Sequence, residues 1–451
     1  LTLGMAVDAN VLIYERIREE MASGKLMRKA INDGFGNAIS AIVDANVTTL
    51  LTGIVLAVFG TGPIRGFAIT LIIGIITSFM TAVFLTRLLL DDYASRENAK
   101  TLAFETAMSR NILRNVNIDF IKIRRWSYIG SGILIVICIL GLIPGALQSE
   151  LNFGIDFSGG RNYVIRFEQP VSTEAVRESL DNVFKATLED NEKFSLNVIT
   201  IGNANQVRVS TNYRIHEAND TIDEKIEALL YEGCKPFMAE DVTASRFHDT
   251  QEDDKVGIVS SQKVGPSIAD DIKVSAVWSI LFALVIIALY IFIRFRNFSF
   301  SIGGLAGLAH DTVIILGLYA LLWKIMPFSM EIDQSFIAAI LTVIGYSIND
   351  TVVIFDRIRE YNTLYPKRER RLNINEAINK TLSRTFSTSM STFVVVLAIF
   401  IFGGETIRGF IFALMLGVIV GTYSSIFIAT PIAYDIYQGV ENWKARRAEK
   451  R

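Results

Sequence analysis

Hydrophobic and polar stretches alternate along the whole chain, and many of the hydrophobic stretches approach the roughly 20 apolar residues that a bilayer-spanning helix needs. These stretches lie at about residues 1–14, 38–60, 66–90, 127–147, 273–293, 299–323, 335–355, 386–403 and 409–437. The first is too short for a complete span, so we expect the chain to begin part-way through a membrane helix. The pattern predicts a polytopic α-helical membrane protein.

The long polar segment 150–268 has a different pattern, which is typical of a small α+β domain. Strands are predicted at 162–168, 197–202, 206–212 and 257–263, and helices at 172–184 and 220–231, the second of which we expect to stop at Gly233. The order β-α-β-β-α-β predicts a ferredoxin-like fold. The glycines of FGIDFSGG (153–160) predict a tight turn into the first strand, with Asp156 as a turn residue.

Short loops rich in Lys and Arg indicate how the spans are oriented, because such loops stay in the cytoplasm. They occur at 25–30, 110–125, 294–297, 366–371 and 444–451. They fall at alternate ends of the predicted spans, as a consistent topology requires. The α+β domain is therefore expected on the extracytoplasmic side.

The composition excludes several classes of function. Of the 451 residues, 51% are hydrophobic, and a formal net charge of −2 gives no indication of nucleic-acid binding. The histidines have no metal-ligand spacing, and no phosphate-binding loop of the Walker type occurs. We therefore expect no enzyme, no metal and no cofactor.

One three-helix unit occurs twice in the sequence. The charged ending ERIRE (15–19) matches DRIRE (356–360), the stretch 31–50 matches 374–393 without gaps, and GPIRGF (62–67) matches ETIRGF (405–410). Both charged endings precede basic loops, so both copies cross the bilayer in the same direction. Transporters with such parallel repeats place their sites near the membrane interior, at the interface between repeats.

Ionisable residues interrupt the apolar runs of both copies. Counting from the charged endings, Asp8 and Asp350 lie in the inner part of the bilayer, and Asp44 and Arg384 enter at a similar depth. We expect these four residues to share one layer. An ionised group in hydrocarbon costs about 2.5–3.5 kcal/mol even on lenient scales, so they must face one another or water. A proton relay is the favoured interpretation, and the alternative is a buried ion pair that only locks helices together.

Polar residues beside the charged positions are candidates for a supporting role. On the span that carries Asp350 they are Ser347, Asn349, Thr351 and Asp356. Hydrogen bonding between helices is the alternative for each of them taken alone. Together they favour a polar path through the membrane.

The motifs resemble those of the SecD and SecF protein-export subunits, of the resistance–nodulation–division superfamily, over nearly the whole chain. VDANVLIYERIREE, DANVTTL and FGTGPIRGFA are similar to the C-terminal membrane half of SecD. FGIDFSGG, VGPSIADDI, GLAHDTVIILG, GYSINDTVVIFDRIRE, NKTLSRTFSTS and FGGETIRGF are similar to SecF from end to end. The order is that of natural SecD–SecF fusions, but the first transmembrane helix of SecD, its large periplasmic domain and the next two helices are absent.

The resemblance implies a function and a set of residues. Such proteins associate with the SecYEG channel and use proton flow to draw an unfolded preprotein outward. The proton path of the family maps onto Asp8, Asp350 and Arg384, and Asp44 is similar to a SecD position. His310 and Asp311 match a SecF motif near the cytoplasmic end of a helix, where we leave a proton role and a packing role open.

The resemblance also divides the chain into segments. They are SecD-like transmembrane helices (1–92), a cytoplasmic linker (93–125), a first SecF-like helix (126–148), a periplasmic ferredoxin-like domain (149–268), further SecF-like helices (269–438) and a basic cytoplasmic tail (439–451). We expect a multi-pass protein of the bacterial inner membrane, surrounded by lipid. Its expected function is a proton-driven accessory motor for protein export. The alternatives are a proton-driven exporter of a lipid or small amphiphile and a passive scaffold for the translocon.

Overall fold

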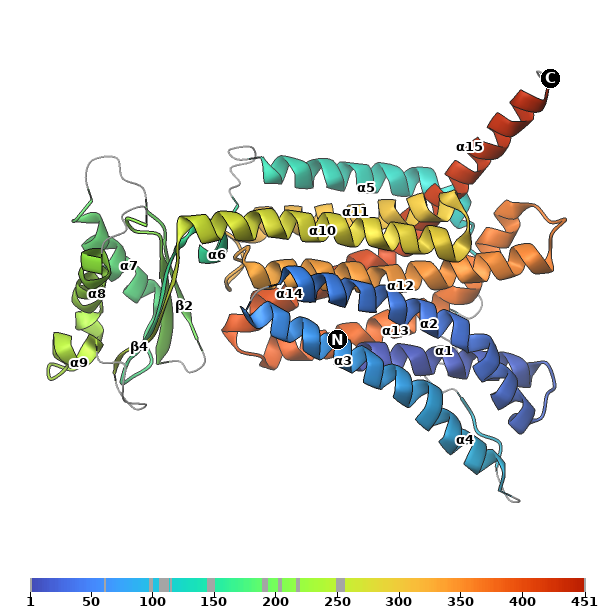
Figure 1. Cartoon of the computed structure of the whole chain (residues 1–451), viewed down its shortest axis with the longest axis horizontal. Helices are drawn as coiled ribbons and strands as arrows, with labels where there is room; N and C mark the ends of the chain where they lie inside the picture. Colours follow the sequence, from blue (N-terminus) through green and yellow to red (C-terminus); the bar gives the residue numbers. More distant parts are fainter. Residues whose placement is uncertain are drawn as a thin grey trace.

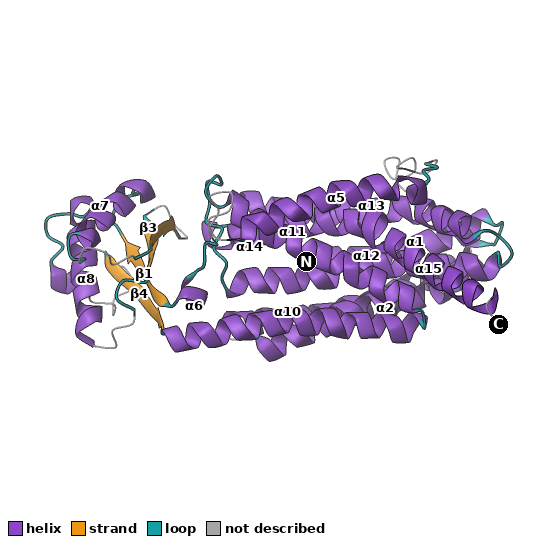
Figure 2. Cartoon of the chain, turned by 90° about the horizontal axis from the view of Figure 1, so that it is seen from above, coloured by secondary structure: helices purple, strands orange, loops and turns teal. Residues whose placement is uncertain are grey.

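The computed structural model has two parts, a long bundle of helices and a small α+β domain at one end of it (Figures 1 and 2). It describes residues 2–60, 62–96, 100–104, 113, 116–143, 151–188, 194–201, 205–215, 220–248 and 256–449. Parts of the predicted linker 93–125, residues 97–99, 105–112 and 114–115, lie outside these residues. The N-terminal bundle elements are α1 (Thr2–Ala22), α2 (Met27–Phe59), α3 (Gly62–Met80), a π-helical stretch (Thr81–Leu85), α4 (Thr86–Ala94) and α5 (Phe120–Leu142). The C-terminal ones are α10 (Pro266–Phe295), α11 (Phe298–Leu322), α12 (Gln334–Leu364), α13 (Arg370–Phe402), α14 (Glu405–Ser424), a second π-helical stretch (Ser425–Ala429) and α15 (Thr430–Glu449).

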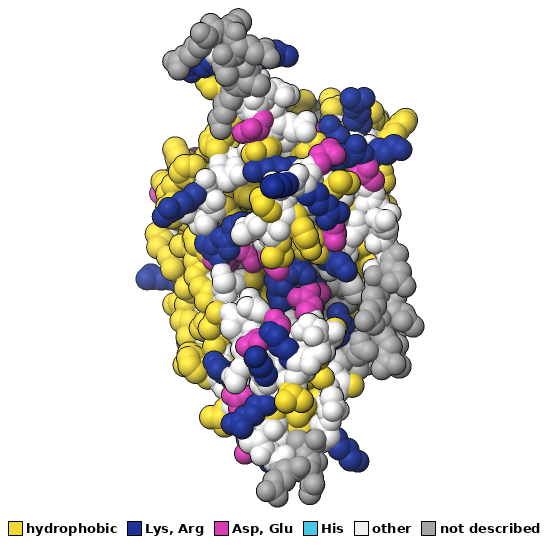
Figure 3. All heavy atoms as spheres, turned by 90° about the vertical axis from the view of Figure 1, so that its right-hand side faces the viewer, with side chains coloured by type: hydrophobic (Ala, Val, Ile, Leu, Met, Phe, Trp, Pro, Cys, Tyr) yellow, Lys and Arg dark blue, Asp and Glu magenta, His cyan; other side chains and the backbone are white. Residues whose placement is uncertain are grey.

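The bundle has the dimensions and surface of a multi-pass membrane protein. Within the described residues, eight helical segments are long and apolar enough to span a bilayer, and α1 is not among them because its C-terminal half is charged. We call the end that carries the α+β domain the domain end, and the opposite end the basic end. Figure 3 shows the basic end, where Lys, Arg, Asp and Glu side chains gather over the helix termini beside a hydrophobic flank. The predicted polytopic helical fold is confirmed.

The α+β domain contains the four strands that the sequence predicts. They are β1 (Gly160–Arg166), β2 (Leu196–Thr200), β3 (Gln206–Thr211) and β4 (Gly257–Val264), in the antiparallel order β2-β3-β1-β4. Helices α7 (Thr173–Lys185) and α8 (Asp220–Cys234) cover one face, and the other face is turned toward the bundle (Figure 1). This is the ferredoxin-like arrangement. The sheet and the two helices enclose a core of their own, which includes Tyr163, Phe184 and Leu230.

The two predicted helices of this domain are present, but one boundary differs and two short helices were not predicted. Ser172 caps α7 through its side chain, which accepts a hydrogen bond from Ala175 N. Helix α8 does not stop at Gly233 but continues to Cys234, and Gly233 lies so close to Leu180 of α7 that a β-carbon there would collide with it. The segment FGIDFSGG forms a short helix, α6 (Ile155–Ser158), before the strand, and a further short helix, α9 (Ala244–His248), was not predicted.

The two copies of the repeated unit fold alike in detail. Helices α2 and α13 both contain 33 residues, and their ends lie 343 residues apart. Each copy also has a five-residue π-helical stretch in its third helix, Thr81–Leu85 and Ser425–Ala429, and these lie 344 residues apart, one more than the ends of α2 and α13. In both, the threonine that follows the stretch, Thr86 or Thr430, donates its hydroxyl to the carbonyl five residues earlier.

Helix α12 runs through the centre of the bundle. In its most apolar 18-residue window, 94% of the residues are buried, whereas 28% are buried in the corresponding windows of α10 and of α13. Glycines allow its neighbours to approach closely, because a β-carbon at Gly417 or Gly421 of α14 would collide with Val343 or Ser347 of α12. Polar side chains within this window of α12 are therefore surrounded by protein rather than by lipid.

Candidate functional site

Asp8, Asn349 and Arg384 meet where the two copies of the repeat touch. One carboxylate oxygen of Asp8 accepts a hydrogen bond from Nη2 of Arg384 at 2.7 Å, and the other accepts one from the side-chain amide of Asn349. All three side chains are buried. Asn349 is the residue that the repeat aligns with Asp8, so equivalent positions of the two copies contact each other across the pseudo-twofold axis.

Asp350 lies beside this group without a direct ion pair. Its Oδ2 accepts a hydrogen bond from the hydroxyl of Ser389 at 3.3 Å, and Thr422 of α14 donates to the same serine oxygen at 2.7 Å. Nε and Nη1 of Arg384 are buried and have no hydrogen-bond partner in the part of the chain that the structure describes. Arg384 is therefore in direct contact with the Asp8 carboxylate, whereas no ion pair among the described residues joins it to Asp350.

The structure does not bring Asp44 into this group. Asp44 accepts hydrogen bonds from Nε of Arg294 at 2.6 and 2.7 Å and from the hydroxyl of Tyr290 at 2.8 Å, both on α10. Arg294 also lies 3.9 Å from Asp356, which in turn pairs with Arg359. The expected single layer of four residues is therefore two clusters. Sequence reasoning missed Arg294 and Tyr290, since RFRN was interpreted only as a cytoplasmic loop.

His310 and Asp311 form a third buried cluster. Nδ1 of His310 lies 3.0 Å from Asp311, whose other oxygen accepts hydrogen bonds from Ser347 at 2.6 Å and Ser424 at 2.8 Å. The predicted position near a helix end was wrong, because both residues lie at the middle of α11. Ser347 thus supports Asp311 rather than Asp350.

Other predicted supporting residues divide between the clusters. Asn349 belongs to the Asp8 cluster and Asp356 to the Asp44 cluster. Thr351 is buried on α12, and no hydrogen bond among the described residues joins it to Asp8, Asp350 or Arg384. Thr422 and Ser424 were not predicted, although both are polar residues in an apolar run, which is the signal that identified the others.

Two small cavities lie between the Asp8 cluster and the charged helix ends, and Arg384 lines both. The first, about 20 Å³, is lined by Asp8, Asn349, Arg384 and Asn46 among others. The second has the same volume, about 20 Å³, and includes Arg384, Glu15 and Asp356 in its lining. Each is large enough for about one water molecule with polar neighbours. Polar groups therefore follow one another from Arg384 toward the charged helix ends.

Reciprocal ion pairs close the bundle at that end. Arg16 of α1 contacts Glu360 of α12 at 3.1 Å, and Arg357 of α12 contacts Glu19 of α1 at 2.5 Å. In the repeat, Arg16 is equivalent to Arg357 and Glu19 to Glu360. This is the pattern that a two-fold axis produces, and it explains why the same charged ending occurs twice.

At the domain end, the motif FGIDFSGG is joined to the start of α12. Phe153 and Ile332 form a parallel β-bridge, with Ile332 N donating to Asn152 O at 2.8 Å. The Asp156 carboxylate accepts a hydrogen bond from Gln334 N at 3.2 Å, and Asp333 caps the helix by accepting one from Phe336 N at 2.8 Å. Asp156 is therefore more than a turn residue, since it binds the first turn of the helix that carries Asp350.

Burial raises the pKa of Asp333 to about 6; the neighbouring Asp156 and Glu331 add to the increase, while the bond from Phe336 N and the charge of Arg208 oppose it. Burial also raises the pKa of Asp156. A carboxyl with a raised pKa in the folded state contributes stability that is present below its unfolded pKa of 3.8 and is lost as the pH rises through about 6.

We therefore expect Asp333→Asn, which keeps a capping oxygen, to reduce the loss of stability between pH 5 and pH 7.5 by on the order of 1–2 kcal/mol. Thermal unfolding of the purified protein at the two pH values measures this difference. Asp270→Asn removes an exposed acid and controls for the change in net charge. An unchanged pH dependence in Asp333→Asn would show that Asp333 does not titrate in this range.

Fold and site together define a multi-pass membrane protein in which two parallel copies of a three-helix unit enclose buried acids and a guanidinium. The sequence matches the family described as "Protein export membrane protein SecD/SecF, C-terminal" over residues 1–96 and 244–439. Residues 149–171 match the "SecD/SecF GG Motif". The chain belongs to the SecD/SecF family of protein-export membrane proteins, as its motifs indicate.

Individual relatives agree with this assignment. The chain is 39% identical to the protein translocase subunit SecF of Rhodothermus marinus over 340 residues, which are 75% of this chain and 97% of that protein. It is 34% identical to the protein translocase subunit SecDF of Thermus thermophilus over 98% of this chain and 53% of that protein. The crystal structure of SecDF from Thermus thermophilus, described as a translocon-associated membrane protein, superposes with a TM-score of 0.77 at 30% identity, over 98% of this chain and 54% of that one.

The chain thus spans about half the length of the SecDF relatives that it matches. These relatives are named as protein translocase subunits, and no catalytic activity is attached to those names. The predicted order, a SecD-like part followed by a SecF-like part, is confirmed.

Proposed function

We propose that the chain is the membrane part of an accessory component of the Sec translocase, which uses the proton motive force to promote export of preproteins across the bacterial inner membrane. The proposed partners are the SecYEG channel and an unfolded preprotein, with the α+β domain on the periplasmic side. Protons are the only cofactor that the proposal requires. The observation that carries it is the group of Asp8, Asn349, Asp350 and Arg384, buried between the two copies of the repeat.

The charges of this group favour the binding of a single proton. With both carboxylates ionised and Arg384 positive, the three groups carry a net charge of −1. One bound proton makes them neutral. Because a net charge in a low-dielectric interior is costly, a change in the surroundings of Asp350 alters its tendency to hold the proton. Such coupling between charge and surroundings is what a proton relay needs.

Helix α12 provides a route from the proton to the α+β domain. The same helix carries Asp350 at its middle and is bound at its first turn by Asp156 and Phe153 of the segment that leads into β1. A shift of α12 on protonation is therefore transmitted to the sheet through a bonded connection. One proton moving through 100 mV releases about 2.3 kcal/mol, so several protons are needed for a large movement.

Proton flux through reconstituted vesicles tests the proposal. We expect vesicles that contain the chain to acidify when an outside-acidic pH gradient and a compensating potassium potential are applied, faster than empty vesicles. A passive scaffold for the translocon predicts no difference from empty vesicles. That result, obtained with protein of verified fold and orientation, would contradict the proposed use of the proton motive force.

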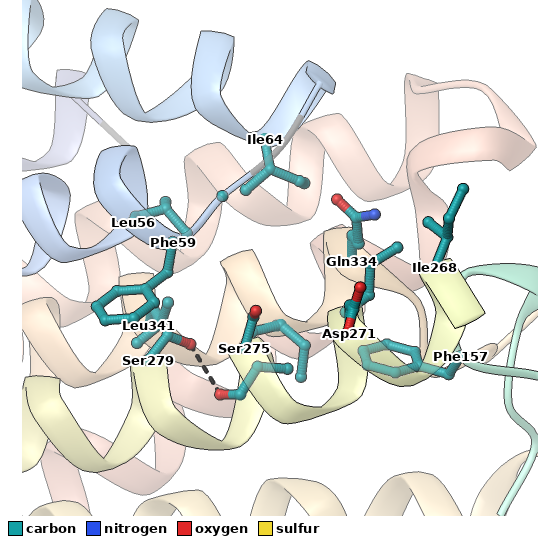
Figure 4. Close-up of a pocket in the computed structure, with 14 residues that line it drawn as sticks. Leu56, Phe59, Ile64, Phe157, Ile268, Asp271, Ser275, Ser279, Gln334 and Leu341 are labelled. Carbon is teal, nitrogen blue, oxygen red and sulfur yellow. Dashed lines mark hydrogen bonds between the residues drawn. The ribbon is translucent and has the colours of Figure 1, made fainter. Parts of the chain in front are cut away.

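An exporter of a lipid or small amphiphile is the second candidate, and one cavity favours it. A cavity of about 290 Å³ opens at the domain end between α2, α3, α10 and α12, with an apolar lining that includes Leu56, Phe59 and Leu341 (Figure 4). Ser275, Asp271 and Gln334 provide polar groups at the same site. Accumulation of a lipid in a deletion strain, with normal preprotein export, would support this candidate over the first.

A further inference from the structure

A groove separates β2 of the α+β domain from the loop between α11 and α12. The cavity measures about 670 Å³. One wall is formed by the consecutive residues 195–200, and the opposite wall by residues 323–324 and 326–331. Consecutive strand residues line a cavity in this way when the edge of the strand, rather than one face, is turned toward it. The six residues 195–200, of which the last five form β2, span about 20 Å at 3.3 Å per residue.

The edge of β2 has main-chain groups available for pairing. It is an outer strand of the sheet, and among the described residues it pairs with β3 alone. Ile201 N donates to Gln206 O at 3.0 Å, which makes these two residues a hydrogen-bonded pair. The N–H and C=O groups of successive residues in an antiparallel strand point to opposite sides. Those of Ile199 therefore also face β3, whereas those of Val198 and Thr200 point into the groove.

The opposite wall contains large apolar side chains and already takes part in strand-like pairing. Trp323, Met326 and Phe328 line the groove. The same loop ends at Ile332, which forms the parallel bridge to Phe153 described above. The groove therefore continues an interface in which extended backbone of the domain pairs with extended backbone of the membrane part. The side chains of Asn197 and Glu331 are hydrogen-bonded across it.

We propose that this groove binds an extended polypeptide segment, which pairs with the outer edge of β2 as an additional strand. Only an extended chain presents N–H and C=O groups at alternate residues, and this is how peptides add to exposed sheet edges. A lipid tail cannot satisfy these groups. The inference rests on the proposed function in one respect: the segment is assigned to the polypeptide being exported.

Proline at an outward-facing position of β2 tests the proposal. Thr200→Pro removes one donor from the groove and leaves the ladder to β3 in place, since proline is tolerated on edge strands. The probe is a fluorescent eight-residue peptide of alternating valine and threonine with lysine at both ends, titrated against the purified 451-residue chain. We expect Thr200→Pro to weaken binding roughly tenfold, the effect of one lost hydrogen bond.

Two controls make the result specific. Ser261→Pro makes the matching change on β4, the other edge strand. The main-chain groups of Gln262 and Ser260 face β1, so those of Ser261, which lies between them, face outward. Ser261 does not line the groove. We expect it to leave binding unchanged. A peptide N-methylated at alternate residues needs no variant of the protein, and we expect it not to bind.

Equal binding of the plain and N-methylated peptides would overturn the proposal, and so would equal loss in Thr200→Pro and Ser261→Pro. No binding of the plain peptide to the folded chain would also overturn it, whatever else occupies the groove. The titration uses no proton gradient, so its failure would leave the proposed proton-driven function standing. A failed flux experiment would, conversely, leave peptide binding to β2 intact.

Discussion

Replacing Asp350 by Asn abolishes proton flux and the stimulation of preprotein export, while the protein remains folded: this is the largest functional effect that we expect from one substitution. Asparagine has nearly the same volume and accepts the hydrogen bond from Ser389. It cannot bind or release a proton, so the group with Asp8 and Arg384 loses its titration. The measurements are proton flux in vesicles and preprotein import into vesicles that also contain SecYEG.

Thr342→Val is the matched control for Asp350→Asn. Thr342 is buried on the same helix, and its hydroxyl has no hydrogen-bond partner in the described part of the chain. We expect this variant to retain both activities. If Asp350→Asn is folded and still conducts protons at the unmodified rate, Asp350 is not part of the path and the relay proposal fails.

Replacing Arg294 by Met has the largest expected effect on stability. Asp44 would remain buried with only Tyr290 as a partner, and an unpaired buried carboxylate of this kind costs about 3–5 kcal/mol. The expected result is a marked loss of stability in unfolding by detergent or heat. Asp44→Asn in the same chain removes the stranded charge, so the double variant is expected to recover most of the loss.

The comparison of these variants also separates two roles for Asp44. If Asp44 only binds α2 to α10, the double variant recovers stability and proton flux together. If Asp44 is part of the proton path, stability recovers but flux does not. Arg125→Met, which removes an exposed arginine, is expected to change stability little. A stable Arg294→Met variant would contradict the assigned ion pair.

The general architecture was predictable from the sequence because it depends on the length of the apolar runs and on the spacing of apolar residues within each element. Bilayer thickness fixes the length of an apolar run, and alternation fixes the strands, so the spans and the strand order of the α+β domain follow from local pattern. The repeated unit could be found by comparing the first part of the sequence with the last part. Asp8, Asp350 and Arg384 could be placed at a similar depth by counting from the charged endings of the two copies, and Asn349 could be named only as a polar residue beside them.

Partners on helices outside the repeat could not be predicted in this way. Arg294 ends an apolar run and precedes a basic loop, so counting charges assigns it to the loop, whereas its side chain turns back to Asp44. Similarly, Asp156 looks like a turn residue because its bond to Gln334 joins positions 178 residues apart. Both contacts depend on how separate elements pack, which a local pattern does not contain.

The π-helical stretches in the third helix of each unit bear on how these helices can move. Single π-helical turns inside α-helices occur frequently at functional sites, and both halves contain one. The i→i+5 hydrogen bonds of such a stretch interrupt the regular α-helical ladder. Each half therefore has a local change of helix type in its third helix, and in the second half it lies directly after Thr422 and Ser424, the hydroxyls that contact the Asp350 and Asp311 clusters.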